Sequence, residues 1–486
     1  MNKKLDIYQQ KAITNADRYT LLIAPAGSGK TFTITEKIDY LIKNKNIKEN
    51  EILCISFTNK SVESLNNKLK EKNYNILCYT FHKLGLEILK KENYKIVEYK
   101  LLEYIIDEYF THLINSSNKK RVLRFLNIQF NNYNYNNKYL NISKNNMIQI
   151  KTITNRFINL FKANNYNKNN FEFFIKQESN KKAKDFLIVI LYIYLLYQSE
   201  LESRKEIDFN DMISLATLYV ENNGYDKKIK YLIIDEFQDT SKVRFDLIKA
   251  ILNKTGASFL AVGDDFQSIY RFTGCDLDLF LNFKNYFKDS TILKLKNTYR
   301  NSNELINIAS NFIMKNNNQI KKDVASFKSL NRPIEIIYYF NIKKAFLKLI
   351  NKIYINTNKP ILILGRNNND INMILNKDLS LEKDSLIYKK NLSIKMKYLT
   401  VHKAKGLEEE NVIIINLKDD ILGFPNKIKD NKLLKYVTCK TDQFPYSEER
   451  RLFYVALTRT KNKVYLLTPV FKKSAFVKEL IKKTKL

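Results

Sequence analysis

The sequence has no tryptophan and few cysteines, histidines and prolines: four, three and six in 486 residues. The cysteines, Cys54, Cys78, Cys275 and Cys439, stand far apart and form no C-x-x-C pair. Zinc and iron–sulfur sites need clustered ligands, so this spacing argues against both classes of site. Scattered thiols are typical of a reducing cytosol, and we expect a cytoplasmic protein.

The sequence also lacks an apolar run long enough to cross a membrane. The longest, FLIVILYIYLLY at 186–197, has twelve residues, whereas a membrane span needs ~20. The first ten residues, MNKKLDIYQQ, carry charge and no apolar core, so they do not resemble a signal peptide. We therefore expect a buried helix at 186–197 and no membrane partner.

Acidic residues are scarce relative to basic ones. There are 50 Asp and Glu against 83 Lys and Arg, which gives a net charge of +33. Such an excess favours a polyanionic partner, most simply a nucleic acid. The chain is also rich in Asn, Ile and Tyr, as AT-rich genomes encode, and part of its lysine has that compositional origin. Charge alone therefore favours nucleic-acid binding without deciding it.

Eight short apolar runs, each followed by a polar or glycine-containing turn, indicate buried strands of parallel sheets. They lie at 19–24, 51–57, 230–235, 259–264, 334–340, 361–365, 411–417 and 464–469. Helical patterns separate several of them; Ile34, Ile38, Leu41 and Ile42, for example, share one helical stripe. The alternation predicts an α/β fold with a parallel sheet in each half.

Residues 86 to about 205 interrupt this alternation. They hold helical patterns and the low-complexity stretch NNYNYNNKYLNISKNN at 131–146. We interpret them as a helical insertion with a mobile loop.

The stretch APAGSGKT at 24–31 follows one predicted strand and opens a predicted helix, which is the context of a phosphate-binding loop. Gly27 and Gly29 let backbone N–H groups curl around phosphate oxygens. Lys30 can reach the β- and γ-phosphates, and Thr31 can ligate Mg²⁺. Ala24 precedes the loop proper and needs no positive φ. The expected nucleotide contacts are Ala26, Gly27, Ser28, Gly29, Lys30 and Thr31.

The stretch IIDEFQDT at 233–240 is a predicted strand that ends in two carboxylates. Asp235 would hold Mg²⁺, and Glu236 would orient and deprotonate the attacking water. A lone Asp-Glu pair is more often a solvated strand end. This pair lies downstream of a phosphate loop, and ligands gather at the carboxyl ends of strands in open α/β sheets. Together the two stretches predict ATP hydrolysis.

Two arginines in the second half are candidates for stabilising the transition state. They are Arg300 in YRNS and Arg459 in VALTRT. An arginine supplied across a cleft can be worth ~10³–10⁵ in rate, and it makes hydrolysis depend on closure of the cleft. Taken singly, each arginine is more often a surface residue.

An ordered series of motifs resembles superfamily 1A DNA helicases of the UvrD/Rep/PcrA type and spans nearly the whole chain. The motifs are LDIYQQKAI (5–13), APAGSGKT (24–31), SFTNKSVESL (56–65), YTFHKLG (79–85), DFNDMI (208–213), IIDEFQDT (233–240), VGDDFQSIYRFTG (262–274), LKNTYRNS (295–302), LTVHKAKGLEEENVIII (399–415) and EERRLFYVALTRTK (448–461). The resemblance implies two RecA-like parallel-sheet cores in tandem, with a helical insertion in the first.

The resemblance also implies a division into subdomains. Residues 1–85 and 206–296 would form core 1A, residues 86–205 the helical insertion 1B, and residues 297–486 core 2A. About 96 residues separate the motif that ends at 302 from the one that begins at 399, too few for the large 2B subdomain of UvrD and Rep. The chain ends about 25 residues after the last motif, so we expect any nuclease to be a partner protein.

For ATP, the resemblance implies roles in both cores. Gln9 reads the adenine, Tyr299 stacks on it, Glu408 binds the ribose, Gln267, Arg300 and Arg459 serve the γ-phosphate, and Thr31 and Asp235 hold Mg²⁺.

For DNA, the resemblance implies stacking on bases by Phe57, Tyr270 and Phe272, and backbone contacts from Thr58, His82, Thr400 and His402. Base–aromatic stacking is worth ~1–3 kcal/mol per base and ignores sequence. Outside these motifs, Phe57 and Phe272 would be ordinary core aromatics.

The chain departs from the family pattern at three positions. Phe272 replaces the usual tryptophan, Thr273 stands where arginine is usual, and Phe266 replaces a common aspartate. Loss of the arginine removes one contact to DNA or to an acidic neighbour, and we expect weaker coupling of hydrolysis to DNA.

Three functions compete. The first is an ATP-driven 3′-to-5′ helicase and translocase on single-stranded or 3′-tailed duplex DNA. The second is a DNA-stimulated ATPase subunit that regulates a partner nuclease in repair or defence, similar to the helicase-like subunit of Gabija-type anti-phage systems. The third, an RNA helicase, is the weakest, because the motifs are those of the DNA-acting branch, although they do not exclude RNA binding.

Overall fold

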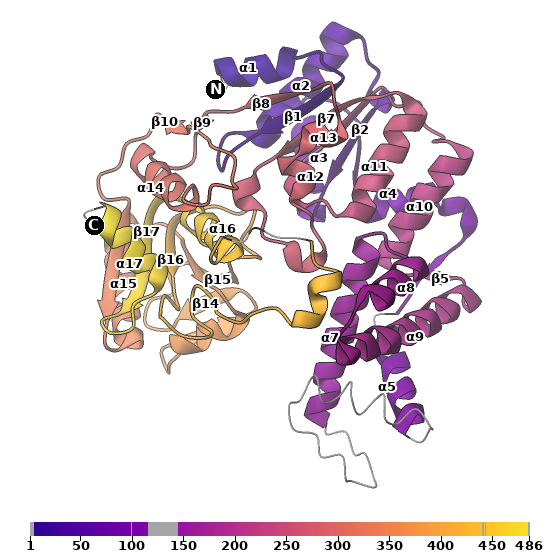
Figure 1. Ribbon diagram of the computed structural model, residues 1–486. Coiled ribbons are helices and arrows are strands. Elements are labelled where there is room, and N and C mark those ends of the chain that lie inside the picture. Colours follow the sequence, from indigo (N-terminus) through magenta and orange to yellow (C-terminus); the bar gives the residue numbers. More distant parts are fainter. Residues whose placement is uncertain (1–3, 99, 115–143, 440–441, 443, 485–486) are drawn as a thin grey trace.

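A computed structural model describes residues 4–98, 100–114, 144–439, 442 and 444–484. The stretch 131–146 and its expected mobile loop therefore lie outside the described residues, apart from 144–146. The described chain forms two α/β cores side by side and a helical bundle below the first (Figure 1).

The first core is built on a six-stranded parallel sheet of order β3-β2-β6-β7-β1-β8. Its strands are β1 (Tyr19–Ile23), β2 (Ile52–Ser56), β3 (Leu77–Thr80), β6 (Tyr231–Ile234), β7 (Ser258–Gly263) and β8 (Ser290–Lys294). Successive side chains point to opposite faces. Leu21 and Ile23 thus join the apolar core on one face, and Leu22 joins that on the other.

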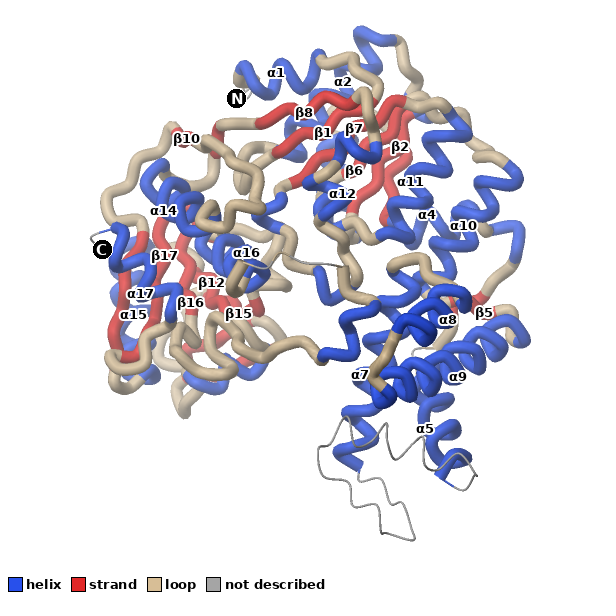
Figure 2. The backbone as a smooth tube through the Cα atoms, in the orientation of Figure 1, coloured by secondary structure: helices blue, strands red, loops and turns tan. Residues whose placement is uncertain are grey.

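Helices cover both faces of this sheet (Figure 2). One layer is α1 (Ile7–Thr14), α2 (Lys30–Lys45) and α3 (Asn59–Lys70); the other is α4 (Phe81–Ile88), α10 (Phe209–Asn223), α11 (Lys242–Thr255), α12 (Asp278–Leu281) and α13 (Phe283–Tyr286). In α2 the predicted stripe faces inward: Ile34, Ile38 and Leu41 are buried, and Ile42 is partly buried.

The second core is built on a seven-stranded sheet of order β11-β17-β16-β12-β15-β14-β13. Its strands are β11 (Ile334–Tyr339), β12 (Ile361–Gly365), β13 (Leu379–Glu382), β14 (Ser385–Tyr388), β15 (Met396–Thr400), β16 (Glu409–Ile414) and β17 (Thr460–Pro469). Helices α14 (Asn303–Ile313), α16 (Ser447–Leu457) and α17 (Ala475–Thr484) cover one face, and α15 (Ile342–Thr357) covers the other. The predicted α/β class with tandem RecA-like cores is confirmed.

One edge of the second sheet differs from the expectation of a purely parallel sheet. Strands β13 and β14 form an antiparallel hairpin, and β14 pairs antiparallel with β15. Its two-residue turn is Lys383-Asp384, with Lys383 at φ 54°. Such turns favour Asn-Gly or Asp-Gly. This one lacks glycine, so the sequence carried no clear hairpin signal.

The helical bundle consists of α5 (Leu101–Ile114), α7 (Lys144–Ala163), α8 (Lys168–Gln177) and α9 (Lys181–Ser203). Phenylalanine rings fill its centre; Phe161 and Phe171, for example, stack with centroids 4.0 Å apart. Strand β4 (Lys95–Ile96) pairs with β5 (Glu206–Ile207) at its base. Ile88 and Leu89 pack in the first core, so the bundle begins after β4 rather than at residue 86.

The apolar run 186–197 lies in α9, as expected for a helix. By length and mean hydropathy (1.3), α9 is the one helix among the described residues that could cross a membrane. Phe186, Ile190, Ile193 and Tyr197 line one side of α9 and pack into the centre of the bundle. That packing is typical of the core helix of a helical domain.

A segment of the second core crosses to the bundle between β16 and α16 (Figures 1 and 2). We name residues 424–439 the strap. Leu433 and Leu434, in the short 3₁₀ helix Lys432–Tyr436, are buried in the apolar centre of the bundle together with Val437. The Asn164 side chain donates to the Val437 carbonyl at 2.8 Å. The bundle is therefore inserted in one core and bound by the other.

Candidate functional site

The phosphate loop lies beneath the first residues of the second core. Gly27 has φ 73°, and a Cβ on it would lie 2.5 Å from Cβ of Arg300. The Thr298 hydroxyl donates to the Ala26 carbonyl at 2.8 Å, and the Tyr299 N–H donates to the Gly27 carbonyl at 2.9 Å. Only glycine combines this backbone conformation with such a close approach.

The rest of the loop follows the expected pattern. Gly29, at φ 82°, immediately precedes Lys30, the first residue of α2, so the helix N-terminus faces the loop. Ser28 is buried. Ala24 is fully buried and is not among the residues with positive φ, and its N–H donates to the Gly263 carbonyl at 2.8 Å. The alanine therefore fits its position.

The lysine of the loop meets the second carboxylate of IIDEFQDT. Nζ of Lys30 lies 2.7 Å from Oε1 of Glu236, which has φ 56°. Burial raises the pKa of Glu236, but Lys30 and Lys405 outweigh it and hold the pKa at about 2. Burial and the neighbouring charge of Glu236 raise the pKa of Asp235 to about 6. Lys30 and Lys405 thus favour the ionised form of Glu236, whereas the pKa of Asp235 lies above its ordinary value.

The residues present fit a magnesium ion held together with a nucleotide. Asp235, directly after β6, supplies a carboxylate, and Thr31, in the first turn of α2, supplies a hydroxyl. Within the described ranges, no group of three or more His, Cys, Asp and Glu could hold a metal. Mg²⁺ usually takes one or two carboxylates plus phosphate oxygens and water, so this sparse donor set suits it.

The second core places a buried arginine against the first. The side chain of Arg459 is 1% exposed, and its Nη2 donates to Oε1 of Gln267 at 3.1 Å. Nε2 of Gln267 in turn donates to Oδ2 of Asp264 at 2.7 Å. Burial, with Arg300 nearby, lowers the pKa of Arg459 to about 9. Two residues expected at the γ-phosphate thus touch each other across the core boundary.

Arg300 and Glu408 also meet. Nε of Arg300 lies 2.6 Å from Oε2 of Glu408, and Nζ of Lys461 lies 3.2 Å from Oε1 of the same carboxylate. The guanidinium of Arg300 also donates to the Thr458 carbonyl at 3.2 Å. In this structure Arg300 is therefore held toward the residue expected at the ribose.

The expected adenine residues come together through Asp6, which the sequence did not single out. The Tyr299 hydroxyl donates to Oδ2 of Asp6 at 2.6 Å. The Gln9 N–H donates to Oδ1 of Asp6 at 2.7 Å, and the Gln9 side chain donates to the Ser28 carbonyl at 3.2 Å. Asp6 also caps α1. The available signal was its place three residues before Gln9.

Aromatic side chains form a row across the boundary between the cores. Phe57 and Tyr270 stack with ring centroids 5.5 Å apart, and Phe272 meets His402 at 5.5 Å. The Tyr270 hydroxyl donates to the His402 carbonyl at 3.0 Å. Phe272 is 46% exposed, so the row reaches the surface. Arg244, absent from the expectations, lies over the Phe57 ring at 4.7 Å.

The other expected DNA contacts lie beside this row or serve the fold. The His82 ring lies 4.8 Å from that of Phe209. Thr58 caps α3 by accepting from the Ser61 N–H at 3.1 Å, and Thr400 accepts from the Lys403 N–H at 3.4 Å. Contact of these residues with DNA stays a prediction.

The three departures from the family pattern have local explanations. Phe266 is fully buried and its ring meets that of Tyr454 at 5.3 Å, so an apolar residue fits there. The Thr273 hydroxyl donates to the Tyr270 carbonyl at 2.8 Å and closes a turn rather than reaching out. Phe272 keeps its place in the aromatic row.

Known protein families match both halves of this arrangement. The UvrD/REP helicase N-terminal domain family matches residues 5–288, and the UvrD-like helicase C-terminal domain family matches residues 373–469. The first match covers more than half of the chain. The chain belongs to the UvrD/Rep helicase family.

Individual relatives resemble this chain in sequence over most of its length. DNA helicase IV of Escherichia coli K12 is 25% identical over 97% of the chain and 69% of the relative. ATP-dependent DNA helicase Rep of Buchnera aphidicola subsp. Acyrthosiphon pisum is 29% identical over 86% of the chain and 62% of the relative. The corresponding Rep of subsp. Schizaphis graminum is 31% identical over 72% and 50%. The chain thus spans between half and about seven tenths of these proteins.

Lys405, which the sequence motifs did not single out, also lies at the candidate site. Its Nζ donates to the Gln267 carbonyl at 2.7 Å, forms an ion pair with Asp239, and lies 3.9 Å from Oε2 of Glu236. A second-core cation thus contacts two carboxylates of IIDEFQDT and the backbone of VGDDFQSIYRFTG in the first core. The signal was its position inside HKAKGLE.

Lys322 is a second missed residue. Its side chain is 2% exposed, pairs with Asp264 and lies 2.5 Å from Oδ1 of Asp265. Its Nζ also lies 3.5 Å from the centroid of the Phe266 ring. Lys322 therefore neutralises the carboxylate that holds Gln267. It lies outside every family motif, between α14 and the short strand β10 (Ala325–Ser326), so the sequence offered no signal.

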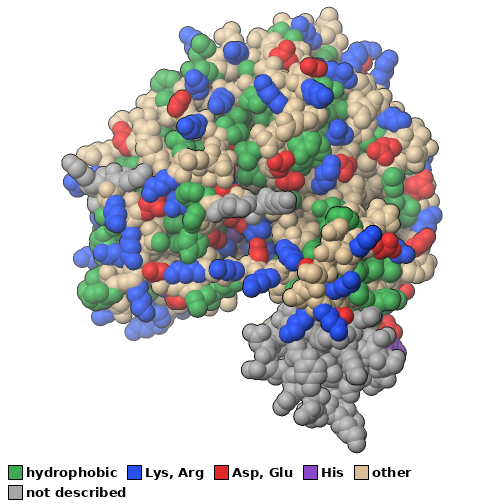
Figure 3. All heavy atoms as spheres, in the orientation of Figure 1, with side chains coloured by type: hydrophobic (Ala, Val, Ile, Leu, Met, Phe, Trp, Pro, Cys, Tyr) green, Lys and Arg blue, Asp and Glu red, His purple; other side chains and the backbone are tan. Residues whose placement is uncertain are grey.

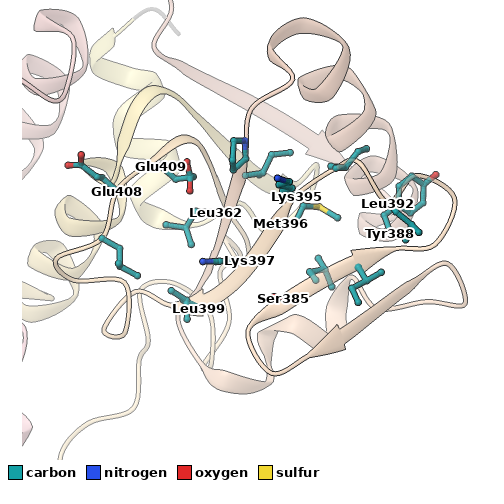
Figure 4. A pocket seen from close by; sticks show the side chains of 16 residues that line it. Leu362, Ser385, Tyr388, Leu392, Lys395, Met396, Lys397, Leu399, Glu408 and Glu409 are labelled. Atoms are coloured by element: carbon teal, nitrogen blue, oxygen red, sulfur yellow. The ribbon is translucent and has the colours of Figure 1, made fainter. Parts of the chain in front are cut away.

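A separate hollow of about 560 Å³ lies in the second core, between β12, β14 and β15. Figure 4 shows Leu362, Met396 and Leu399 lining it, with Glu408 and Glu409 at one end. Of the expected site residues, only Glu408 borders it. This largely apolar hollow is therefore distinct from the phosphate site.

Proposed function

We propose that this member of the UvrD/Rep family is an ATP-driven motor that moves 3′ to 5′ along single-stranded DNA and unwinds 3′-tailed duplexes. The observation that supports this most is the contact of Arg459 with Gln267 across the two cores. A site completed only when both cores meet makes hydrolysis sense closure, and closure moves two DNA-holding surfaces relative to each other.

We assign the first core to subdomain 1A, the bundle to 1B and the second core to 2A. Residues 303–399 are all described, and they form only elements that flank or belong to the second sheet. This supports the proposal of a short form without 2B. The protein is proposed to act in the cytoplasm with DNA as its partner.

Hydrolysis follows from the groups around Lys30. On nucleotide binding, Lys30 exchanges Glu236 for the β- and γ-phosphates. Glu236 is then free to orient water and accept its proton. Arg459 and Arg300 stabilise negative charge that develops on the γ-phosphate. Mg²⁺, held by Thr31 and Asp235, would neutralise phosphate charge. Gln9, Tyr299 and Glu408 hold the base and ribose.

Coupling to DNA follows from the sequence GDDFQSIYRF. Gln267 contacts Arg459, and Tyr270, three residues later, bonds to His402 of the second core. Release of Gln267 toward a γ-phosphate therefore displaces the turn that carries Tyr270 and Phe272. Stacking on Phe57 and Phe272, with backbone contacts from Thr58, His82, Thr400 and His402, would grip the strand alternately.

Strand displacement by the purified chain tests this proposal. The substrates are a 3′-tailed and a 5′-tailed duplex, with ATP and Mg²⁺, and the control is Glu236→Gln. We expect displacement of the 3′-tailed duplex only, and none by the variant. ATPase activity stimulated by single-stranded DNA without displacement would favour the alternative, a DNA-stimulated ATPase subunit that regulates a partner nuclease in repair or anti-phage defence. Equal displacement of both substrates would contradict the polarity.

A further inference from the structure

One carboxylate of the strap joins all three parts of the molecule. Oδ1 of Asp430 lies 2.7 Å from Nη2 of Arg156 on α7, and its Oδ2 lies 2.5 Å from Nη2 of Arg271 in the 3₁₀ helix Arg271–Thr273. Each oxygen thus accepts from a different guanidinium. Arg156 belongs to the bundle, Arg271 to the first core and Asp430 to the second.

These residues border a groove that also holds part of the aromatic row. The groove has a volume of about 1280 Å³, and its walls include Arg156, Arg271, Phe272, Thr400 and His402. Lys403 and Lys429 line it as well. Lys and Arg side chains gather along the edge of the second core toward the bundle (Figure 3). A strand stacked on Phe272 would pass its backbone along this wall.

The two guanidinium groups that share the Asp430 carboxylate could equally donate to the two free oxygens of one phosphodiester. Arginine recognises carboxylate and phosphate through the same fork of N–H donors. Nε of Arg271 donates to Glu448 at 2.8 Å, which fixes this side chain and leaves Nη2 for an anion. We propose that Arg156 and Arg271 form a phosphate site for the DNA strand, and that Asp430 occupies it in the free protein.

The strap does not depend on Asp430 for its position. Leu433, Leu434 and Val437 are buried in the bundle, and Lys435 pairs with Glu178 at 2.8 Å. The Asp430 side chain is 34% exposed, so a strand in the groove can reach and replace it. Asp430 is therefore an intramolecular competitor for the site. The strap stays anchored in the bundle when the Asp430 carboxylate gives way to a phosphate.

The inference rests on the proposed function, because it requires that the groove receive single-stranded DNA. If Asp430 competes with DNA, its removal should tighten DNA binding. If Asp430 instead holds the domains in place, its removal should weaken DNA binding. The two roles thus predict opposite signs for one substitution, Asp430→Asn.

Fluorescence anisotropy with a labelled oligo-dT, without nucleotide, at several KCl concentrations tests the inference. The variants are Asp430→Asn, Arg156→Gln and the control Glu335→Gln. The control removes a carboxylate of the outer strand β11 that pairs with Lys352 of α15. We expect Kd to fall about fivefold to tenfold in Asp430→Asn and to stay unchanged in Glu335→Gln. Arg156→Gln should raise Kd and reduce the slope of log Kd against log [KCl] by about 0.7.

The outcomes separate the two claims. A Kd that is unchanged or raised in Asp430→Asn, with binding by the wild-type chain intact, overturns the phosphate site and leaves the motor proposal standing. An unchanged salt slope in Arg156→Gln overturns the phosphate site by itself, whatever Asp430→Asn does. Absence of oligo-dT binding by all proteins overturns both. The thermal midpoint of each variant verifies folding.

Discussion

Nζ of Lys30 lies 2.7 Å from Oε1 of Glu236, so the proposed phosphate-binding lysine is paired with the proposed base. A lysine bound to a carboxylate cannot hold a phosphate at the same time, and a base neutralised by a lysine accepts a proton poorly. In the proposed mechanism, exchange of Lys30 from Glu236 to the nucleotide would activate the base as the substrate binds. In this structure the pairing keeps both groups from the roles proposed for them.

Glu236→Gln removes the base and also frees Lys30. We expect the kcat of DNA-stimulated ATP hydrolysis to fall by about 10²–10⁴-fold and the affinity for ATP to rise, because the lysine has no competing partner. Steady-state kinetics and equilibrium ATP binding measure both. Glu335→Gln, a distant carboxylate-to-amide change, should alter neither. A fall in ATP affinity would contradict the exchange of Lys30.

Arg459→Lys keeps a positive charge but loses the planar fork that reaches Gln267 and the Leu407 carbonyl. We expect kcat to fall by about 10³-fold or more, with a small change in KM, because the contact matters in the transition state. Arg204→Lys, in a surface ion pair with Glu200 on α9, provides the matched control. Near-normal hydrolysis in Arg459→Lys would exclude the arginine-finger role.

Lys322→Met leaves Asp264 and Asp265 buried without their cation. Breaking a buried ion pair in this way costs about 3–5 kcal/mol, and we expect that loss in the free energy of unfolding from urea denaturation. Lys352→Met breaks a surface pair with Glu335 and should cost about 0–1 kcal/mol. Equal losses in the two variants would show that the buried cluster has no special importance.

The two histidines of the aromatic region should make stability depend on pH. Burial lowers the pKa of His82 and His402 from 6.5 to about 4, with added repulsion from Arg244 at His82 and from Arg366 and Lys405 at His402. Between these values the unfolded chain binds protons that the folded chain does not. The free energy of unfolding therefore falls as pH drops from 6.5 to 4, by roughly 3 kcal/mol for each histidine.

Denaturation of His402→Gln at several pH values measures that contribution. The fall in unfolding free energy between pH 6.5 and 4 should be smaller in the variant than in the wild-type chain. His112→Gln, at an exposed position of α5, should keep the wild-type profile. A variant that keeps the full acid loss would show that His402 titrates normally.

Much of the fold was predictable because parallel sheets bury their strands on both faces. All eight apolar runs overlap strands of the two sheets. The family motifs located both cores and brought Lys30 and Glu236, and Gln267 and Arg459, into the same site. These residues were predictable because the motifs that carry them resemble those of the UvrD/Rep family and follow in the same order.

The remainder depends on contacts between segments that are far apart in the sequence. Lys322 lies 58 residues from Asp264, and nothing in its neighbourhood marks it as buried. Asp430 lies 274 residues from Arg156. Such pairings become visible only when the domains are placed together. The antiparallel edge was missed for a local reason, because its turn, Lys383-Asp384, carries no glycine.

Besides the side-chain contacts at the core boundary, such as Lys322 with Asp264, two attachments join the halves of the molecule. One is the covalent passage from β8 (Ser290–Lys294) into the second core, and the other is the anchorage of Leu433 and Leu434 in the bundle. While the strap stays seated, any motion of the second core against the first is also transmitted to the bundle through Leu433 and Leu434.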